Sequence, residues 1–238
     1  MSLLVFVLVF SFGCSNSEVS DSGQGKEAGD TAVRAEGKGE TEATEDKRGG
    51  AEDLTGSASG EETSEAADAD KENRQKVTAV IDIRDYGKIT MELDPDAAPV
   101  TVENFVKLVR EGFYDGLTFH RIMDGFMIQG GDPQGNGSGG APETIKGEFS
   151  QNGVQNPLSH VRGTVSMARS QDPDSASSQF FIVQSDSTFL DGQYAAFGKV
   201  TKGMEIVDQI CKDALPIDDN GTIPADEQPV INSITIKE

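Results

Sequence analysis

The chain of 238 residues carries 41 Asp and Glu against 20 Lys and Arg, a formal net charge of −21. This acidity argues against a nucleic-acid partner, because binding a phosphate backbone needs clustered Lys and Arg. Two His and two Cys are too few for a Cys₄ or His₃ metal site, and no apolar run reaches the ~18–20 residues of a membrane-spanning helix.

The chain begins with an apolar segment, in which Leu3–Phe10 is uninterrupted and Cys14 follows shortly after. This pattern resembles a bacterial lipoprotein signal peptide, in which cleavage leaves the Cys at the N-terminus to carry lipid. It departs from that pattern at Ser11, where an aliphatic residue is usual, and in lacking any Lys or Arg before Lys26. We predict a signal peptide over residues 1–14 with lipidation at Cys14. The alternative is an uncleaved apolar N-terminus with an ordinary cysteine.

Residues 15–76 contain no aromatic residue, no Ile and no Met, with 8 Lys and Arg against 17 Asp and Glu, a net of 8 − 17 = −9. Such a segment buries too little apolar surface to offset an ordering entropy of roughly 1–2 kcal/mol per residue. We predict a disordered acidic tether. Together with a lipidated Cys14, it would place the rest of the chain on the extracytoplasmic side of a bacterial cell membrane, anchored only by lipid.

All Pro and all Tyr residues lie from Val77 onward, together with most of the Phe residues. Residues 77–238 are therefore predicted to form one folded domain with a substantial core. Residues 77–83 alternate apolar and polar side chains and lead through a Tyr86-Gly87 turn into residues 88–93. This is the pattern of a β-hairpin.

Two helices are predicted in this domain. Apolar residues recur with helical spacing from Val102 to Val109, and Gly112 stands where a glycine commonly ends a helix. A second apolar face runs along residues 204–211 and includes Cys211, which we expect to be a buried thiol.

Short β-rich segments make up most of the remaining domain, namely 117–122, 126–129, 163–168, 180–183, 196–200 and 230–236. Many short strands with only two helices indicate an antiparallel barrel or sandwich rather than a βαβ sheet. Nothing in the sequence indicates assembly, so we expect a monomer.

A glycine-rich loop is predicted from Gly130 to Pro157. Within it, Gly135, Gly137 and Gly140 have the spacing of the dinucleotide-binding fingerprint. That motif opens a helix, whereas here Ala141-Pro142 follows and no helical period appears. We therefore interpret these glycines as turn residues of a surface loop.

Four blocks of the domain occur in an order that one protein family shares. Residues 119–132 read FHRIMDGFMIQGGD, and SMARS (166–170), SQFFI (178–182) and FLDG (189–192) follow. These blocks resemble the cyclophilins, the peptidyl-prolyl cis-trans isomerases, and the resemblance covers nearly all of residues 77–238. It implies a closed antiparallel eight-stranded β-barrel capped by two α-helices, proline-containing polypeptides as substrates and no cofactor.

The chemistry of this reaction suits one residue of the first block. Rotation about an X-Pro bond passes through a twisted state that lies about 18–20 kcal/mol above the planar amide, and in that state the prolyl nitrogen regains a lone pair. A fixed donor aimed at that lone pair stabilises the twisted amide more than the planar one. Arg121 carries a permanently charged, rigid set of donors, and the resemblance implies that it is the catalytic residue.

The resemblance also implies a set of substrate-binding residues. Four apolar members would line a pocket for the proline ring, although their alternation along the strands is equally that of an ordinary barrel core. Two glutamines would hold the substrate backbone or orient the arginine. The whole set is Phe126, Met127, Gln129, Ala168, Arg169, Gln179, Phe181, Phe189, Leu190 and Tyr194.

The sequence also supports an expectation for each of three further residues. Arg169 stands where the family often has Asn, so we expect its charge to alter the preference for the residue before proline. His120 adjoins Arg121 without an evident acid–base duty and is interpreted as structural. His160, near Pro157, is interpreted as a loop residue.

Two functions remain open at this point. One is an active prolyl isomerase that helps exported or surface proteins to fold, and the other is a non-catalytic module, a chaperone or adhesin, that holds proline-containing segments. The presence of Arg121 with Phe126 and Gln129 favours the isomerase, because a module that only holds its ligand does not require the arginine.

Overall fold

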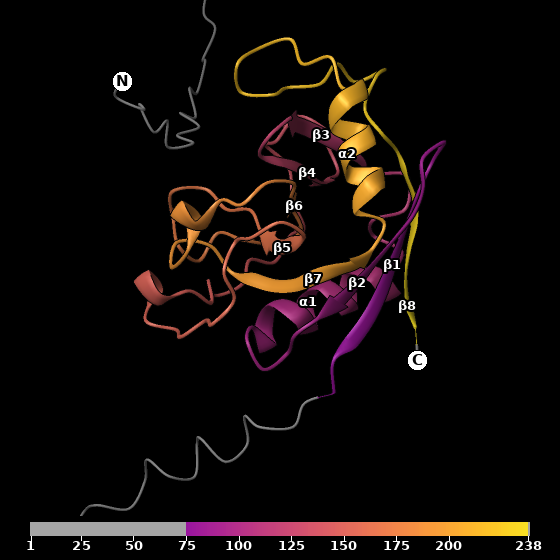
Figure 1. The fold of residues 1–238 in the computed structure, drawn as a ribbon. Helices are drawn as coiled ribbons and strands as arrows, with labels where there is room; N and C mark the ends of the chain where they lie inside the picture. Colours follow the sequence, from indigo (N-terminus) through magenta and orange to yellow (C-terminus); the bar gives the residue numbers. More distant parts are fainter. Residues whose placement is uncertain (1–74, 238) are drawn as a thin grey trace, which may run out of the picture. The chain divides into compact units, whose positions relative to one another are not determined.

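The computed structural model describes residues 75–237, which form eight strands and two α-helices (Figure 1). The predicted signal peptide, Cys14 and almost all of the acidic tether lie outside the described residues. The strands are β1 (Val77–Ile83), β2 (Gly87–Leu93), β3 (Thr118–Met123), β4 (Met127–Asp132), β5 (Thr164–Met167), β6 (Phe180–Val183), β7 (Ala196–Lys202) and β8 (Ile231–Lys237). The helices are α1 (Pro99–Arg110) and α2 (Met204–Asp213), and short 3₁₀ turns occur at η1 (Ser150–Asn152) and η2 (Thr188–Leu190).

Every predicted strand and helix is present, with ends that differ by a few residues. The largest differences are at the start of α1, which begins at Pro99 instead of Val102, and at the end of β4, which continues through Gly130 to Asp132, where the sequence indicated the start of a loop. A side chain at Gly130 would place a Cβ atom 2.6 Å from the backbone oxygen of Thr118. Glycine at this position therefore allows the close approach of β3 and β4 instead of ending the strand.

Helix α1 begins at a proline and is held by a distant carboxylate. Pro99 occupies the first turn, where its missing N–H costs no helical hydrogen bond. The buried Glu148 accepts hydrogen bonds from the backbone N–H of Val100 at 3.0 Å and of Thr101 at 2.8 Å, and from the Thr101 hydroxyl at 2.6 Å. These bonds satisfy N–H groups that a helix leaves without internal partners, and they place negative charge at the positive end of the helix dipole.

All paired strands are antiparallel, in the order β3-β4-β6-β5-β7-β2-β1-β8. The prediction of a closed barrel is wrong, because the two end strands β3 and β8 share no ladder. Two isolated bridges, Thr118 with Val230 and Arg121 with Thr222, join β3 to the segment of residues 221–230, which covers much of the outer edge of β3. Pro229 in this segment has no N–H to donate, which prevents a regular strand pairing there. The result is an open, curled sheet.

The main hydrophobic core lies on one face of this sheet and receives the apolar faces of both helices. Phe105 of α1 packs against Tyr114, Phe180 and Phe197, with ring centroids 5.1 to 5.5 Å apart. Helix α2 adds residues that include Cys211, a free and buried thiol as predicted, and burial raises its pKa to about 12.

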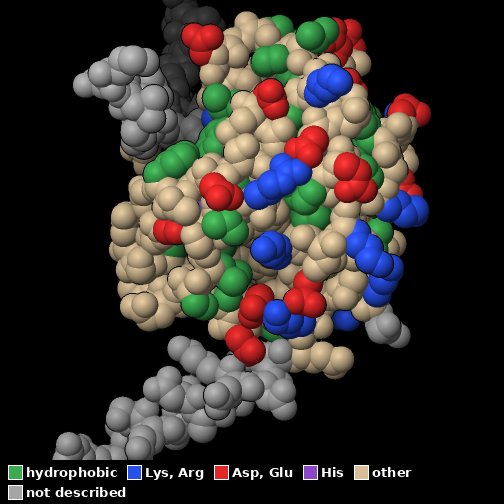
Figure 2. Space-filling model, in the orientation of Figure 1, with side chains coloured by type: hydrophobic (Ala, Val, Ile, Leu, Met, Phe, Trp, Pro, Cys, Tyr) green, Lys and Arg blue, Asp and Glu red, His purple; other side chains and the backbone are tan. Residues whose placement is uncertain are grey.

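Charged side chains of both signs occur on the face of the domain that Figure 2 presents. Figure 2 shows acidic and basic side chains interspersed over one face.

Within residues 75–237, no three His, Cys, Asp or Glu side chains lie close enough together to hold a metal ion. None of the helices in this part of the chain has the length and hydropathy needed to cross a bilayer.

Candidate active site

The predicted site residues come together on the face of the sheet opposite the main core. Four neighbouring strands, β3, β4, β6 and β5, pair Arg121 with Gln129, Gln129 with Phe181, and Phe181 with Ser166. Directly paired residues have Cβ atoms about 4.5–5.5 Å apart and point to the same face. These four side chains therefore stand in one row across the sheet.

Beside this row lies a second hydrophobic cluster, separate from the main core. Its buried members are Met127, Phe181, Val183 and Leu190, and the partly buried Met123, Phe126, Ala168 and Tyr194 pack against them. Along β6, Phe180 and Ile182 belong to the main core, whereas Phe181 and Val183 belong to this second cluster. The four residues predicted for the proline pocket are thus neighbours outside the main core, a distinction that the sequence pattern left open.

Arg121 borders this cluster and is only 8% exposed. Its Nε–H donates to the backbone oxygen of Asn220 at 2.7 Å, and Nη1 donates to Oε1 of Gln129 at 3.3 Å. Other contacts of the guanidinium are with the sulfur atoms of Met127, 3.8 Å from Nη1, and Met123, 3.1 Å from Nη2. Burial lowers the pKa of Arg121, but an arginine stays protonated in proteins.

These contacts leave donor capacity on the cluster side of Arg121. Thioether sulfur is a weak acceptor, so the N–H groups beside the two methionines give up little when they turn to another acceptor. The guanidinium also lies 6.0 Å from the centre of the Phe126 ring, which stands at the edge of the cluster. The arrangement therefore offers fixed, charged donors next to an apolar surface.

The segment that carries Asn220 is fitted closely to β3. The backbone N–H of Ile122 donates to the oxygen of Gly221 at 2.8 Å, and Ile223 N–H donates to the oxygen of His120 at 3.0 Å. Gly221 has φ +84°, and a side chain there would approach the Ile122 oxygen to 2.6 Å. Sequence reasoning missed this segment, because its partner in the site lies 99 residues earlier in the chain.

The two predicted glutamines connect Arg121 to the glycine-rich loop. Gln129 donates from Nε2 to Oε1 of Gln179 at 2.9 Å. Gln179 in turn donates from Nε2 to the backbone oxygens of Gly137 at 3.1 Å and Gly139 at 2.7 Å. Gln129 therefore contacts the arginine directly, and Gln179 contacts it only through Gln129.

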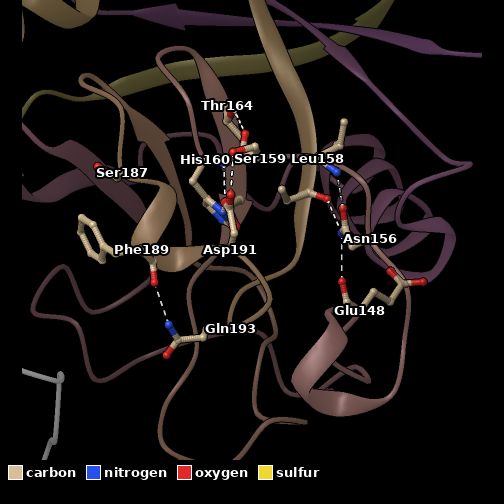
Figure 3. Close-up of polar contacts among 12 residues, drawn as sticks. Glu148, Asn156, Leu158, Ser159, His160, Thr164, Ser187, Phe189, Asp191 and Gln193 are labelled. Carbon is tan, nitrogen blue, oxygen red and sulfur yellow. Dashed lines mark hydrogen bonds and ion pairs between the residues drawn. The ribbon is translucent and has the colours of Figure 1, made fainter.

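Two aromatic residues form another edge of the cluster, which we call its rim: Phe189 of the FLDG block and Tyr194, which follows that block. Phe189 is 58% exposed, and its ring lies 5.7 Å from the Phe126 ring. The backbone oxygen of Phe189 accepts a hydrogen bond from Gln193 (Figure 3). Tyr194 stands edge-on to Phe181 at 5.9 Å. Phe189 and Tyr194, both predicted to bind substrate, therefore adjoin the cluster.

Ala168 and Arg169 lie at the end of β5 beside this rim. The Ala168 N–H is used inside the fold, because it donates to the Gln179 oxygen at 2.9 Å. The Arg169 guanidinium is stacked 4.8 Å from the Tyr194 ring and 5.1 Å from the Phe149 ring, and it donates to the backbone oxygen of Gln193 at 2.9 Å. Its contacts with the fold indicate that this residue holds the rim together.

Sequence analysis did not predict a polar network that His160 forms with Asp191 and Ser166 beside the second cluster. His160 lies in a loop as expected, but it is fully buried and stacks on Phe181 with ring centroids 6.0 Å apart. Its Nδ1 contacts Asp191 at 2.8 Å, as Figure 3 shows, and its Nε2 contacts the Ser166 hydroxyl at 3.0 Å. Since a carboxylate only accepts, Nδ1 carries the proton. Burial lowers the pKa of His160, which favours the neutral ring, although Asp191 opposes this shift. The network therefore packs against Phe181 and contacts Ser166, two residues of the row described above.

His120 has a different environment. It is buried beside Arg121 on β3, and neither ring nitrogen has a hydrogen-bond partner within residues 75–237. Burial lowers its pKa, so it is held neutral. This environment agrees with the interpretation of His120 as a structural residue.

Comparisons with known proteins identify the family. Residues 78–238 match the sequence profile of the family described as cyclophilin type peptidyl-prolyl cis-trans isomerase/CLD. Peptidyl-prolyl cis-trans isomerase B of Bacillus subtilis is 51% identical over 123 residues, which are 52% of this chain and 82% of that protein. A probable peptidyl-prolyl cis-trans isomerase of Brucella suis is 47% identical over 160 residues, 62% of this chain and 76% of the relative.

A solved structure supports the same assignment. The crystal structure of a cyclophilin type peptidyl-prolyl cis-trans isomerase from Cryptosporidium parvum, in the presence of the dipeptide Ala-Pro, is 31% identical with a TM-score of 0.60. The match covers 68% of this chain and 99% of that chain. With a family profile that spans the whole described domain from residue 78, this chain belongs to the cyclophilin-type peptidyl-prolyl cis-trans isomerases.

Proposed function

We propose that this isomerase accelerates X-Pro rotation through Arg121, with the proline ring held in the cluster of Met127, Phe181 and Leu190. The observation that carries the proposal is the position of a buried guanidinium at the edge of an apolar cluster that is separate from the main core. The apolar side chains of this cluster suit a proline ring, and the charged donors beside them suit a developing lone pair.

The mechanism is electrostatic stabilisation of the twisted amide. When the C–N bond loses its double-bond character, the prolyl nitrogen becomes a better acceptor, and an N–H of Arg121 that otherwise contacts methionine sulfur donates to it. The bonds to Asn220 and Gln129 hold the guanidinium in place before the substrate arrives, so little reorganisation is needed during the reaction. Because only the twisted amide gains this bond, the interaction lowers the barrier.

The chain is further proposed to act on exported or surface proteins, from a lipid anchor at Cys14. The apolar segment before Cys14 and the polar, acidic composition that follows it support this location. An isomerase that needs neither ATP nor a diffusible cofactor suits a compartment outside the cytoplasm.

The competing function is a non-catalytic module that holds proline-containing segments in the same pocket. A protease-coupled isomerisation assay on a short peptide with an Ala-Pro bond separates the two. An isomerase raises the rate of cis-to-trans conversion in proportion to its concentration. A module that only binds leaves the rate unchanged while the peptide still perturbs the NMR resonances of Phe181 and Leu190, and that result would refute the catalytic proposal.

A further inference from the structure

The loop after β4 is organised by one buried carboxylate. Asp132, the last residue of β4, is 1% exposed. Its carboxylate accepts hydrogen bonds from the backbone N–H groups of Gln134 at 2.8 Å, Asn136 at 3.1 Å and Gly137 at 2.6 Å. Burial by itself would raise the pKa of Asp132, but these backbone donors outweigh it and lower the pKa. The carboxylate is therefore ionised and fully engaged with the loop.

The glycines of this loop make such an anchor necessary. Residues 135, 137, 139 and 140 are all glycine, and a glycine-rich segment loses more conformational freedom on ordering than any other. The backbone oxygens of Gly137 and Gly139 both accept from Nε2 of Gln179. Both oxygens are thus placed by a loop whose geometry depends on the carboxylate of Asp132.

From these oxygens the hydrogen bonds run in one direction to the arginine. Backbone oxygens only accept, so Gln179 must present Nε2 to the loop and Oε1 to Gln129. Arg121 only donates, so Gln129 must present Oε1 to the arginine and Nε2 to Gln179. The loop oxygens at one end of this series of hydrogen bonds and the arginine at the other end impose the same orientation on both amides. Turning either amide over would set donor against donor or acceptor against acceptor.

We propose that Asp132 is a positioning residue for Arg121, which acts through the carbonyls of Gly137 and Gly139 and the side chains of Gln179 and Gln129. This inference rests on the proposed role of Arg121 and extends it to a residue that has no contact with the pocket. The carboxylate orders the loop, the loop orients the two amides, and the second amide holds Nη1 of Arg121. Loss of the carboxylate loosens the arginine and leaves the apolar cluster intact.

The test is Asp132→Asn in the full chain, with Asp172→Asn as the matched control. Asp172 also accepts a backbone hydrogen bond two residues ahead, from Asp174 at 2.9 Å, but it lies in an exposed loop outside this chain of contacts. We expect Asp132→Asn to lower kcat about tenfold with KM within about twofold, because small misplacements of a catalytic group cost one to two orders of magnitude. Asp172→Asn should retain the wild-type kcat and KM.

Two readouts separate positioning from a merely structural effect. The side-chain amide resonances of Gln129 and Gln179 and the Nε–H resonance of Arg121 should move in Asp132→Asn and stay in place in Asp172→Asn. In an Arg121→Ala background, Asp132→Asn should cause no further loss of activity, because the two residues act on the same step. An equal loss in both backgrounds would overturn the inference.

The outcomes also separate this inference from the proposed function. If Arg121→Ala keeps full activity, the role of Arg121 fails. If Arg121→Ala loses activity while a folded Asp132→Asn keeps it, only the positioning role fails. If Asp132→Asn does not fold, Gln179→Glu is the second variant. It interrupts the same series of hydrogen bonds, because it sets a carboxylate against the backbone carbonyls of Gly137 and Gly139. A folded Gln179→Glu with wild-type kcat would then contradict the proposal.

Discussion

The most direct test of the proposed mechanism is Arg121→Ala. The substitution removes the guanidinium donors that lie beside the apolar cluster, together with the bonds to Asn220 and Gln129. Removal of one preorganised donor costs roughly 2.7–4 kcal/mol in comparable sites. Because each 1.36 kcal/mol is a factor of ten in rate, kcat/KM should fall about 100- to 1,000-fold. The fold should persist, since backbone hydrogen bonds from Ile122 and Ile223 still hold the neighbouring segment on β3.

The assay is protease-coupled isomerisation of a short peptide with an Ala-Pro bond, with circular dichroism to verify folding. Arg110→Ala serves as the control, because it removes the same charge from the exposed end of α1, away from the site residues. We expect the control to retain activity within about twofold, because it leaves the site intact. A folded Arg121→Ala protein with wild-type kcat/KM would show that the arginine takes no part in catalysis.

Three further predictions concern the whole chain. A fragment of residues 77–238 should match residues 15–238 in kcat/KM within about twofold and in Tm within about 2 °C, and loss of activity on truncation would show that the acidic segment belongs to the fold. Cys14→Ser should abolish incorporation of labelled fatty acid, and equal labelling of both proteins would contradict the lipid anchor. Burial lowers the pKa of both His120 and His160, so the unfolded chain binds more protons and the free energy of unfolding should fall from pH 7 to pH 5. Urea titrations check this, and a flat profile over that range would refute it.

The sequence by itself predicted the elements of the domain, because their information is local. Apolar residues that alternate with period two indicated β1 and β8, and helical spacing indicated α1 and α2. The block around Arg121 identified the family through consecutive residues, before any contact was known. These features need only neighbouring positions in the chain, which a sequence displays directly.

The tertiary structure alone decided which face each strand presents and which distant residues support the arginine. Alternation gives Phe180 and Phe181 opposite faces but does not say which face meets the core, since that depends on the pairing of β6 with β4 and β5. The contact of Gln129 with Gln179 spans 50 residues, and that of Arg121 with Asn220 spans 99.

The seam of the sheet follows the same rule. Whether β3 and β8 close a barrel depends on the segment before β8, which lies against β3 although it is far from it in the sequence. The closed barrel expected by resemblance was therefore wrong. Sequence periodicity describes how a segment is buried. The closure of the sheet, the row of Arg121, Gln129, Phe181 and Ser166 across it, and the hydrogen bonds of that row arise from pairings between residues far apart in the chain. For this reason the candidate residues were found from the sequence, and their arrangement only from the structure.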